Sequence, residues 1–153
     1  MKTELVFHWM SPDVITVTPD TPLAEAKTVM NEYKIRRLPV VDNEDKLVGI
    51  VTLGDIRKAS ASNTTLLGVW ELNHLLARSK INMVMTPKPV TVYTTTPIVE
   101  AAQILLEHKV GGLPVVDPAN GALMGIITEA DIFRLVVQTW GKTKTRVLDS
   151  GVK

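Results

Sequence analysis

The chain has 153 residues, of which 45% are hydrophobic and 22% are charged, and its formal net charge is +1. An apolar fraction this high, with so little net charge, excludes a disordered chain. The near-neutral charge argues against a dedicated nucleic-acid binder. The sequence contains no cysteine, which excludes disulfides, thiolate zinc sites and a cysteine nucleophile. A chain of this length can bury roughly two-thirds of its unfolded surface, so we expect a true core.

The N-terminal residues carry no long apolar run of the kind found in signal peptides. Polar residues also interrupt every apolar stretch well before the roughly 18 residues that a spanning helix needs. We therefore expect a cytoplasmic protein with no membrane partner and no nucleic-acid partner.

An internal repeat organises the chain. Residues in the segment 12–42 recur 75 positions later, and one inserted residue in a turn then changes the offset to 76. The matches at the first offset include Pro12, Thr16, Val17, Thr21, Pro22, Glu25, Ala26, Glu32, Lys34 and the run 38–42; those at the second are Leu47, Gly49, Ile50, Thr52, Asp55 and Ile56. We predict one module with repeat 1 over 9–57, a connector over 58–83, repeat 2 over 84–138 and a polar tail over 139–153.

Each repeat shows the same order of predicted elements. Short β-branched segments predict strands at 15–17 and 90–93. The pairs Thr21-Pro22 and Thr96-Pro97 predict helix starts, with threonine as the N-cap and proline as the first helical residue. Apolar residues then follow at helical spacing: Leu23, Ala26, Val29, Met30 and Tyr33 in repeat 1, and Ile98, Ala101, Ala102 and Leu105 in repeat 2.

Two further strands are predicted at 38–41 and 46–53, around a turn at 42–45 that repeat 2 replaces with 117–121. A final helix is predicted to begin at Asp55 and at Asp131. The order strand, helix, strand, strand, helix places the chain in the α/β (α+β) class. Because one repeat is too small to bury both faces of its sheet, we expect the two repeats to pack through their sheets.

The connector predicts one further helix. Its apolar face comprises Leu66, Val69, Trp70, Asn73 and Leu76, after a cap region at 63–65. We interpret Trp70 as a core anchor, with a dimer contact as the alternative. The polar tail from Gly141 to Lys153 is expected to be loose.

Three motifs, each present in both copies, resemble those of the CBS domain. They are Met10-Ser11-Pro12 with 14–17, then 37–42, then 49–56; repeat 2 has Met85-Thr86-Pro87, 113–117 and 125–132. The resemblance covers residues 9–138. The connector segment 70–76 is similar to that of small stand-alone CBS-pair proteins, including the acetoin-utilisation accessory type.

The resemblance implies a Bateman module, in which two CBS repeats related by pseudo-two-fold symmetry form two clefts between them. Such clefts often bind AMP, ADP, ATP or S-adenosylmethionine, and the modules commonly form homodimers that regulate a partner protein, for example in energy sensing. By the family's arrangement, cleft one would contain Pro12, Val14, Ile15, Arg36, Arg37, Ile126, Thr128 and Asp131. Cleft two would contain Pro87, Pro89, Val90, Gly111, Gly112, Ile50, Thr52 and Asp55.

The chemistry of these residues suits an adenosine ligand. A carboxylate at Asp55 or Asp131 can accept hydrogen bonds from both ribose hydroxyls, and the amides of a helix start favour phosphate. The hydroxyls of Thr52 and Thr128 would reach the phosphate or the ribose. The alternative is that each aspartate is only an N-cap; we favour both roles at once.

The two clefts are not equivalent. Arg36-Arg37 is replaced by Gly111-Gly112 in repeat 2, and guanidinium groups suit phosphate oxygens, so cleft one is predicted to be better for a phosphorylated ligand. The alternative is a solvated arginine pair. The glycines would leave room and exposed amides, whereas Pro89 removes an amide donor that Val14 keeps. We therefore predict unequal occupancy.

The sequence favours a regulatory binding module over an enzyme. It contains no phosphate-binding loop or nucleophile-elbow motif, and His8, His74 and His108 lack metal-ligand spacing. We expect no catalytic residue, no metal and no catalytic cofactor. Two alternatives are a constitutive dimeric scaffold with vestigial clefts and, more remotely, a small nucleotide-acting enzyme.

Overall fold

The computed structural model describes residues 3–61 and 68–152, with side chains for 3–60 and 68–141. The chain divides into two compact units, each built from separate segments. Unit 1 comprises Met1–Pro12, Thr91–Pro118 and Met124–Lys153, and unit 2 comprises Asp13–Val90 and Ala119–Leu123. Each unit has a three-stranded sheet, so the predicted mixed α+β class with two tandem repeats is confirmed. No helix within the described ranges is long and apolar enough to cross a membrane.

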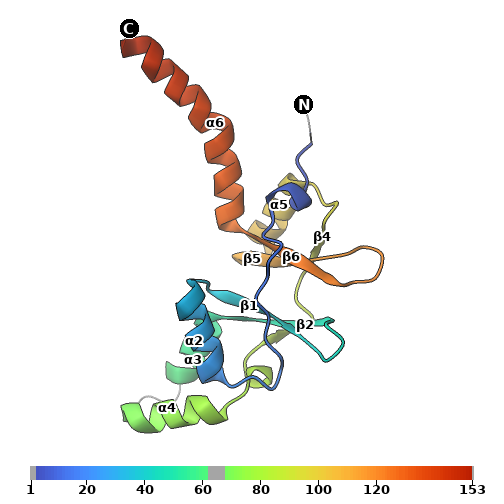
Figure 1. Cartoon of the computed structure of the whole chain (residues 1–153), viewed down its shortest axis with the longest axis vertical. Helices are drawn as coiled ribbons and strands as arrows, with labels where there is room; N and C mark the ends of the chain where they lie inside the picture. Colours follow the sequence, from blue (N-terminus) through green and yellow to red (C-terminus); the bar gives the residue numbers. More distant parts are fainter. Residues whose placement is uncertain (1–2, 62–67, 153) are drawn as a thin grey trace. The chain divides into compact units, whose positions relative to one another are not determined.

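Unit 2 contains most of repeat 1 and the connector. Its elements are α2 (Leu23–Tyr33), β1 (Arg37–Val41), β2 (Leu47–Thr52), α3 (Leu53–Ala61), α4 (Val69–Arg78), the 3-10 helix η1 (Ile81–Met83) and β3 (Thr86–Pro87). Figure 1 shows α2 and α3 beside each other and α4 at the end of this unit. The strands lie in the order β1-β2-β3, and both pairs are antiparallel. The register pairs Arg37 with Thr52, which brings the start of β1 to the end of β2.

Unit 1 repeats this plan with the second copy. Its elements are α1 (Val6–Trp9), β4 (Val92–Tyr93), α5 (Ile98–His108), β5 (Gly112–Val116), β6 (Leu123–Thr128) and α6 (Glu129–Val152). The strand order is β4-β5-β6, with β4 parallel to β5. In unit 2 the same parallel contact is reduced to a bridge between Val17 and Val40, so the strand predicted at 15–17 is only this bridge.

The two cores use equivalent positions. In unit 2 the buried set includes Val17, Leu23, Ala26, Met30, Leu38, Val40 and Val51. In unit 1 it includes Val92, Ile98, Ala101, Leu105, Leu113, Val115 and Ile127, which stand 75 or 76 positions later. The helical spacing predicted these faces correctly except at Tyr33, whose side chain is 57% exposed. The repeat in the sequence is therefore a repeat of the core.

The first residues of each repeat pair with the hairpin of the other repeat. Ser11 pairs with Ile126 in unit 1, and β3 pairs with Gly49 and Ile50 of β2 in unit 2. In Figure 1 the N-terminal segment, in blue, lies beside α5 and β6. A Cβ on Gly125 would lie 2.6 Å from the carbonyl oxygen of Ser11. The glycine of each hairpin is therefore required because a second backbone lies directly against it.

The predicted threonine caps were wrong. Helices α2 and α5 begin one residue later than predicted, so Pro22 and Pro97 occupy the N-cap position and no side chain caps either helix. The threonine hydroxyls serve the preceding turns instead. Thr21 Oγ1 accepts a hydrogen bond from the amide of Thr18, and Thr96 Oγ1 accepts one from the amide of Tyr93.

The connector and the tail also differ from the expectation. Helix α4 forms as predicted and buries Leu76, but Trp70 is 77% exposed, so its interpretation as a core anchor was wrong. Leu66 and the predicted cap at 63–65 lie outside the described residues. The tail was expected to be loose, yet α6 continues to Val152. The segment after Gly141 contains no proline that would end the helix.

Candidate ligand-binding site

A Thr-x-x-Asp turn joins the last strand of each repeat to its last helix. In unit 2, the amide of Thr52 donates to Asp55 Oδ2 at 2.9 Å, and the amide of Asp55 donates to Thr52 Oγ1 at 3.1 Å. Each side chain therefore accepts from the backbone of the other, as in a capping box. The aspartate is the third residue of α3 and not its N-cap, which corrects the helix start predicted at Asp55. This pairing fixes the carboxylate at the junction between strand and helix.

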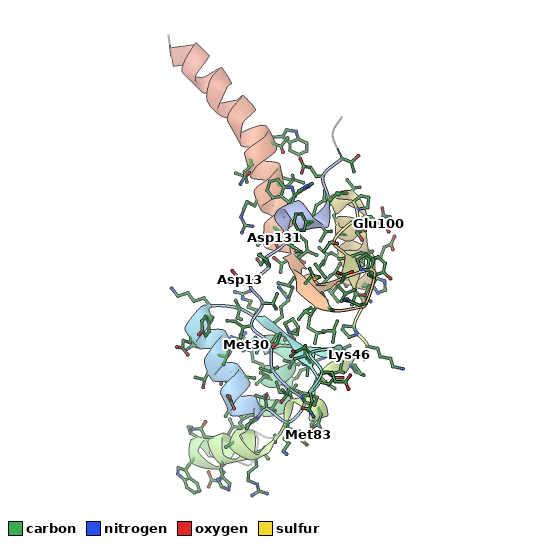
Figure 2. The ribbon with its side chains drawn as sticks, turned by 45° about the vertical axis from the view of Figure 1, so that its right-hand side comes forward. Asp13, Met30, Lys46, Met83, Glu100 and Asp131 are labelled. Carbon is green, nitrogen blue, oxygen red and sulfur yellow. The ribbon has the colours of Figure 1, made fainter. Side chains whose placement is uncertain are left out.

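The equivalent turn in unit 1 is more enclosed. The amide and the hydroxyl of Thr128 both donate to Asp131 Oδ2, at 2.8 and 3.2 Å. Arg134 Nη1 donates to the other oxygen, Oδ1, at 2.6 Å. Asp131 is 3% exposed. Among the described side chains it is the one charged residue that is buried. Figure 2 shows its position near the start of α6.

The two aspartates consequently differ in which carboxylate oxygens remain available to accept a further hydrogen bond. Both oxygens of Asp131 are hydrogen-bonded, whereas the interactions recorded for Asp55 within the described side chains use only Oδ2. Asp55 is also only half-buried. A ribose hydroxyl that approached Asp131 Oδ1 would compete with Arg134, whereas one that approached Asp55 Oδ1 would meet no such competitor. The sequence predicted two unequal sites from the arginine pair, and the turns themselves add this second asymmetry.

Arg36 and Arg37 lie beside the turn of their own unit. Antiparallel pairing sets Arg37 opposite Thr52, and the amide of Leu53 donates to the carbonyl oxygen of Arg36 at 2.8 Å. A pocket of about 360 Å³ lies here in unit 2, and its lining residues are Arg36, Arg37, Thr52, Leu53, Gly54 and Arg57. From the sequence, Arg36 and Arg37 were predicted to lie in cleft one and Thr52 in cleft two. The structure brings all three to one pocket because the register of β1 and β2 makes them neighbours.

The remaining predicted site residues are divided between the units. Unit 2 also contains Val14, Ile15, Ile50, Pro87, Pro89 and Val90; unit 1 contains Pro12, Gly111, Gly112 and Ile126. Gly111 repeats the role of Arg36, since its carbonyl oxygen accepts from the amide of Glu129 at 3.1 Å. Gly112 is buried in β5, so the exposed amide expected there was wrong. The grouping of these residues into two clefts stays a prediction.

Two arginines that the sequence analysis did not single out contribute to the turns. Arg134 pairs with Asp131 three residues earlier on α6, and Arg57 lines the arginine pocket from α3. The spacing of Asp131 and Arg134, three residues apart on a helix, is a signal that could have revealed the first. Arg57 has no acidic neighbour at that spacing, so the sequence carried no comparable signal for it.

The family model for the CBS domain matches residues 4–62 and 79–138, which is more than half of the chain. A CBS domain-containing protein of Dictyostelium discoideum is 37% identical over 134 residues, covering 88% of this chain and 92% of that protein. The inosine-5′-monophosphate dehydrogenase of Methanocaldococcus jannaschii is 42% identical over 122 residues, but the match covers 80% of this chain and only 21% of the enzyme.

Solved structures give the same result. The CBS domain pair of protein MJ0100, in complex with 5′-methylthioadenosine and S-adenosyl-L-methionine, has a TM-score of 0.77 and 30% identity over 90% of this chain and 99% of that one. CBSX2, a protein of Arabidopsis thaliana solved in complex with AMP, has a TM-score of 0.73 and 33% identity over 88% and 97%. A putative acetoin utilization protein of Vibrio cholerae has a TM-score of 0.75 and 26% identity over 94% and 98%.

Two tandem α+β units with a Thr-x-x-Asp turn in each define a protein built from two copies of one structural repeat. The chain belongs to the CBS domain family, and it is a CBS domain pair. The resemblance to stand-alone CBS-pair proteins, including the acetoin-utilisation type, is thereby confirmed. In relatives that are enzymes, such as the dehydrogenase, this chain matches only a part of the protein.

Proposed function

We propose that this CBS pair is a regulatory module that binds an adenosine-containing ligand at its Thr-x-x-Asp turns. The observation that carries the proposal is the turn itself, which fixes a carboxylate where a strand ends and a helix begins in both repeats. A carboxylate held there suits the two hydroxyls of a ribose. Neighbours at 30% and 33% identity were solved with S-adenosyl-L-methionine, 5′-methylthioadenosine and AMP, which supports ligands of this class.

The proposed roles follow from the contacts. Asp55 and Asp131 accept the ribose hydroxyls, and ribose binding at Asp131 displaces Arg134 from Oδ1. Arg36 and Arg37 bind phosphate oxygens when the ligand carries them. The other predicted cleft residues contribute apolar and backbone contacts to the adenine. Because the two turns differ in enclosure, the two sites are expected to differ in affinity.

The test is calorimetric titration of ligand-free protein with AMP, ADP, ATP and S-adenosylmethionine. The variants are Asp55→Asn and Asp131→Asn, and the control is Asp20→Asn, which removes the same charge from a side chain that is 80% exposed. Each site variant should weaken one site at least tenfold, because a hydrogen bond to a charged group contributes about 1.5–3 kcal/mol. Two equal strong sites in the wild type would contradict the predicted inequality. Absence of binding by all four ligands would refute the proposed function.

Ligand binding would act on a partner protein by shifting an equilibrium between two states of the module. A ligand shifts such an equilibrium only by its differential affinity for the two states. We propose a cytoplasmic homodimer in this role, with energy sensing as its purpose if the ligand proves to be AMP, ADP or ATP. The regulated protein would be identified by co-purification with and without the bound nucleotide.

A second candidate function is a dimeric scaffold without a ligand. One surface favours it: on α4, the Trp70 and His74 rings stack with centroids 5.7 Å apart, and Val69 beside them is 79% exposed. Large exposed apolar groups of this kind often contact another protein. A stable dimer in light scattering, combined with no binding in the titrations above, would favour the scaffold.

A further inference from the structure

A second pocket in unit 2 is lined by basic side chains. It has a volume of about 680 Å³ and lies between α2 and α3. Lys27 and Lys34 line it from α2 and its C-cap, Arg36 from the segment before β1, and Arg57 from α3. The other lining residues are Thr28, Met30, Asn31, Ile35 and Leu53. Met30, one of these lining residues, is labelled in Figure 2.

The pocket holds four cations and no acid. Among the described side chains, no ion pair involves Lys27, Lys34, Arg36 or Arg57. All four residues are exposed, so solvent screens the repulsion between their charges. Lys27 and Lys34 stand seven residues apart on α2, with Asn31 between them, so they share one face of the helix. A cluster of exposed charges of one sign creates a local positive potential that attracts a multivalent anion.

The second repeat shows that the fold does not need these cations. The positions equivalent to Lys27, Arg36 and Arg57 are Ala102, Gly111 and Phe133, and Leu53 is replaced by the acidic Glu129. Only Lys34 keeps its charge, as Lys109. Both lysines end their helices in the same left-handed conformation, with φ of 56° and 53°. The helix ending is thus common to both repeats, whereas the basic pocket belongs to repeat 1 alone.

We propose that this pocket binds a linear oligophosphate, a chain of several linked phosphate groups. Guanidinium groups bind phosphate oxygens in a bidentate manner, and lysines add point charges. Linked phosphate groups carry several negative charges, which matches the four cations that line the pocket. The volume of about 680 Å³ lies within the range of small-molecule pockets and exceeds what one phosphate fills. The same pocket shares Arg36, Leu53 and Arg57 with the arginine pocket of about 360 Å³, so the two pockets are neighbours.

Two sources supply this chemistry, the phosphate tail of a nucleoside triphosphate and a free inorganic oligophosphate. If the phosphate tail enters the pocket, ATP should displace tripolyphosphate, and Lys34→Asn should weaken the binding of ATP more than the binding of AMP. If a free oligophosphate is the ligand, AMP and tripolyphosphate should bind together without competition. Either result supports the pocket.

The experiment is calorimetric titration of the full chain with inorganic tripolyphosphate. The test variant is Lys34→Asn, and the matched control is Lys109→Asn, because asparagine tolerates the left-handed conformation at both positions. The wild type should bind tripolyphosphate saturably, and Lys34→Asn should weaken binding about fivefold, the effect of one unit charge about 4 Å from another in water. Adding Lys27→Ala, which installs the residue of repeat 2, should weaken it about 25-fold in total. Lys109→Asn should have no effect.

Two results would overturn the proposal: no binding of tripolyphosphate to the wild type, whether or not an acidic peptide binds instead, or equal titrations of the two asparagine variants. The proposed ribose sites are tested separately by Asp55→Asn and Asp131→Asn. Those variants are titrated with AMP, whereas Lys34→Asn and Lys109→Asn are titrated with tripolyphosphate, so failure of the adenosine proposal is distinguishable from failure of this one.

Discussion

The two Thr-x-x-Asp turns predict different costs for the same substitution. Asp131→Ala removes a carboxylate that is 3% exposed and accepts from the Thr128 amide, the Thr128 hydroxyl and Arg134. Asp55→Ala removes a half-buried carboxylate that accepts from the Thr52 amide, while the bond from the Asp55 amide to Thr52 Oγ1 remains possible.

The magnitudes follow from these contacts. Loss of the Asp55 carboxylate resembles the loss of a helix cap and should cost about 1 kcal/mol. Loss of the Asp131 carboxylate leaves an amide and a guanidinium without their acceptor, and each bond to a charged group contributes about 1.5–3 kcal/mol. Because Arg134 is 54% exposed, water replaces part of its bond. We therefore expect a cost of about 3 kcal/mol at Asp131.

The assay is thermal and urea unfolding of the two alanine variants beside the wild type. At this chain length 1 kcal/mol corresponds to about 2–4 °C, so Tm should fall by about 6–12 °C for Asp131→Ala and by about 2–4 °C for Asp55→Ala. Arg134→Met serves as a control that keeps the turn and removes only the partly exposed ion pair, and it should cost about 1 kcal/mol or less. Equal losses at the two aspartates would refute the reasoning, because they would show that the additional contacts of Asp131 contribute nothing.

Two further substitutions test the packing. Gly125→Ala places a Cβ 2.6 Å from the carbonyl oxygen of Ser11 and should destabilise unit 1 by about 1–3 kcal/mol. The Cβ of Gly54→Ala, on a helix, meets only Thr52 Oγ1 at 3.5 Å, so this variant should raise stability by up to about 1 kcal/mol. Urea unfolding that ranks the two variants in the opposite order would contradict the glycine argument. Trp70→Ser should change stability by no more than about 0.5 kcal/mol, because the side chain is 77% exposed; a loss of 3–5 kcal/mol in the same assay would restore its role as a core anchor.

Most of the fold was predictable because the same residue pattern occurs in both repeats. Positions such as Leu23 and Ile98 are apolar in both copies, and the paired pattern identified the core of each unit. The caps were not predictable from Thr21 and Thr96, because a threonine hydroxyl can serve the helix after it or the turn before it with the same local sequence. Trp70 was misread for a related reason, since a helical face shows which residues lie together and not whether anything covers them.

The candidate site was predictable only where its residues lie close in sequence. Thr52 and Asp55 are three positions apart, and their bonds follow from the start of a helix. The basic pocket collects Lys27, Arg36 and Arg57 from three separate elements. A charge on each of these elements is unremarkable alone, and their convergence depends on the packing of α2 against the hairpin and α3.

The first residues of each repeat pair with the hairpin of the other repeat, and this has a consequence for folding during synthesis. Unit 1 needs Ser11 for its pairing with Ile126, and unit 2 needs β3 for its pairing with β2. Neither unit can therefore be completed while only its own repeat has left the ribosome, although domains that are continuous in sequence usually fold during synthesis. The segment that contains Ser11 therefore stays unpaired until the strand that contains Ile126 has been translated. During that interval the segment can pair with the same hairpin of a second nascent chain, so domain swapping between two copies can first occur during translation.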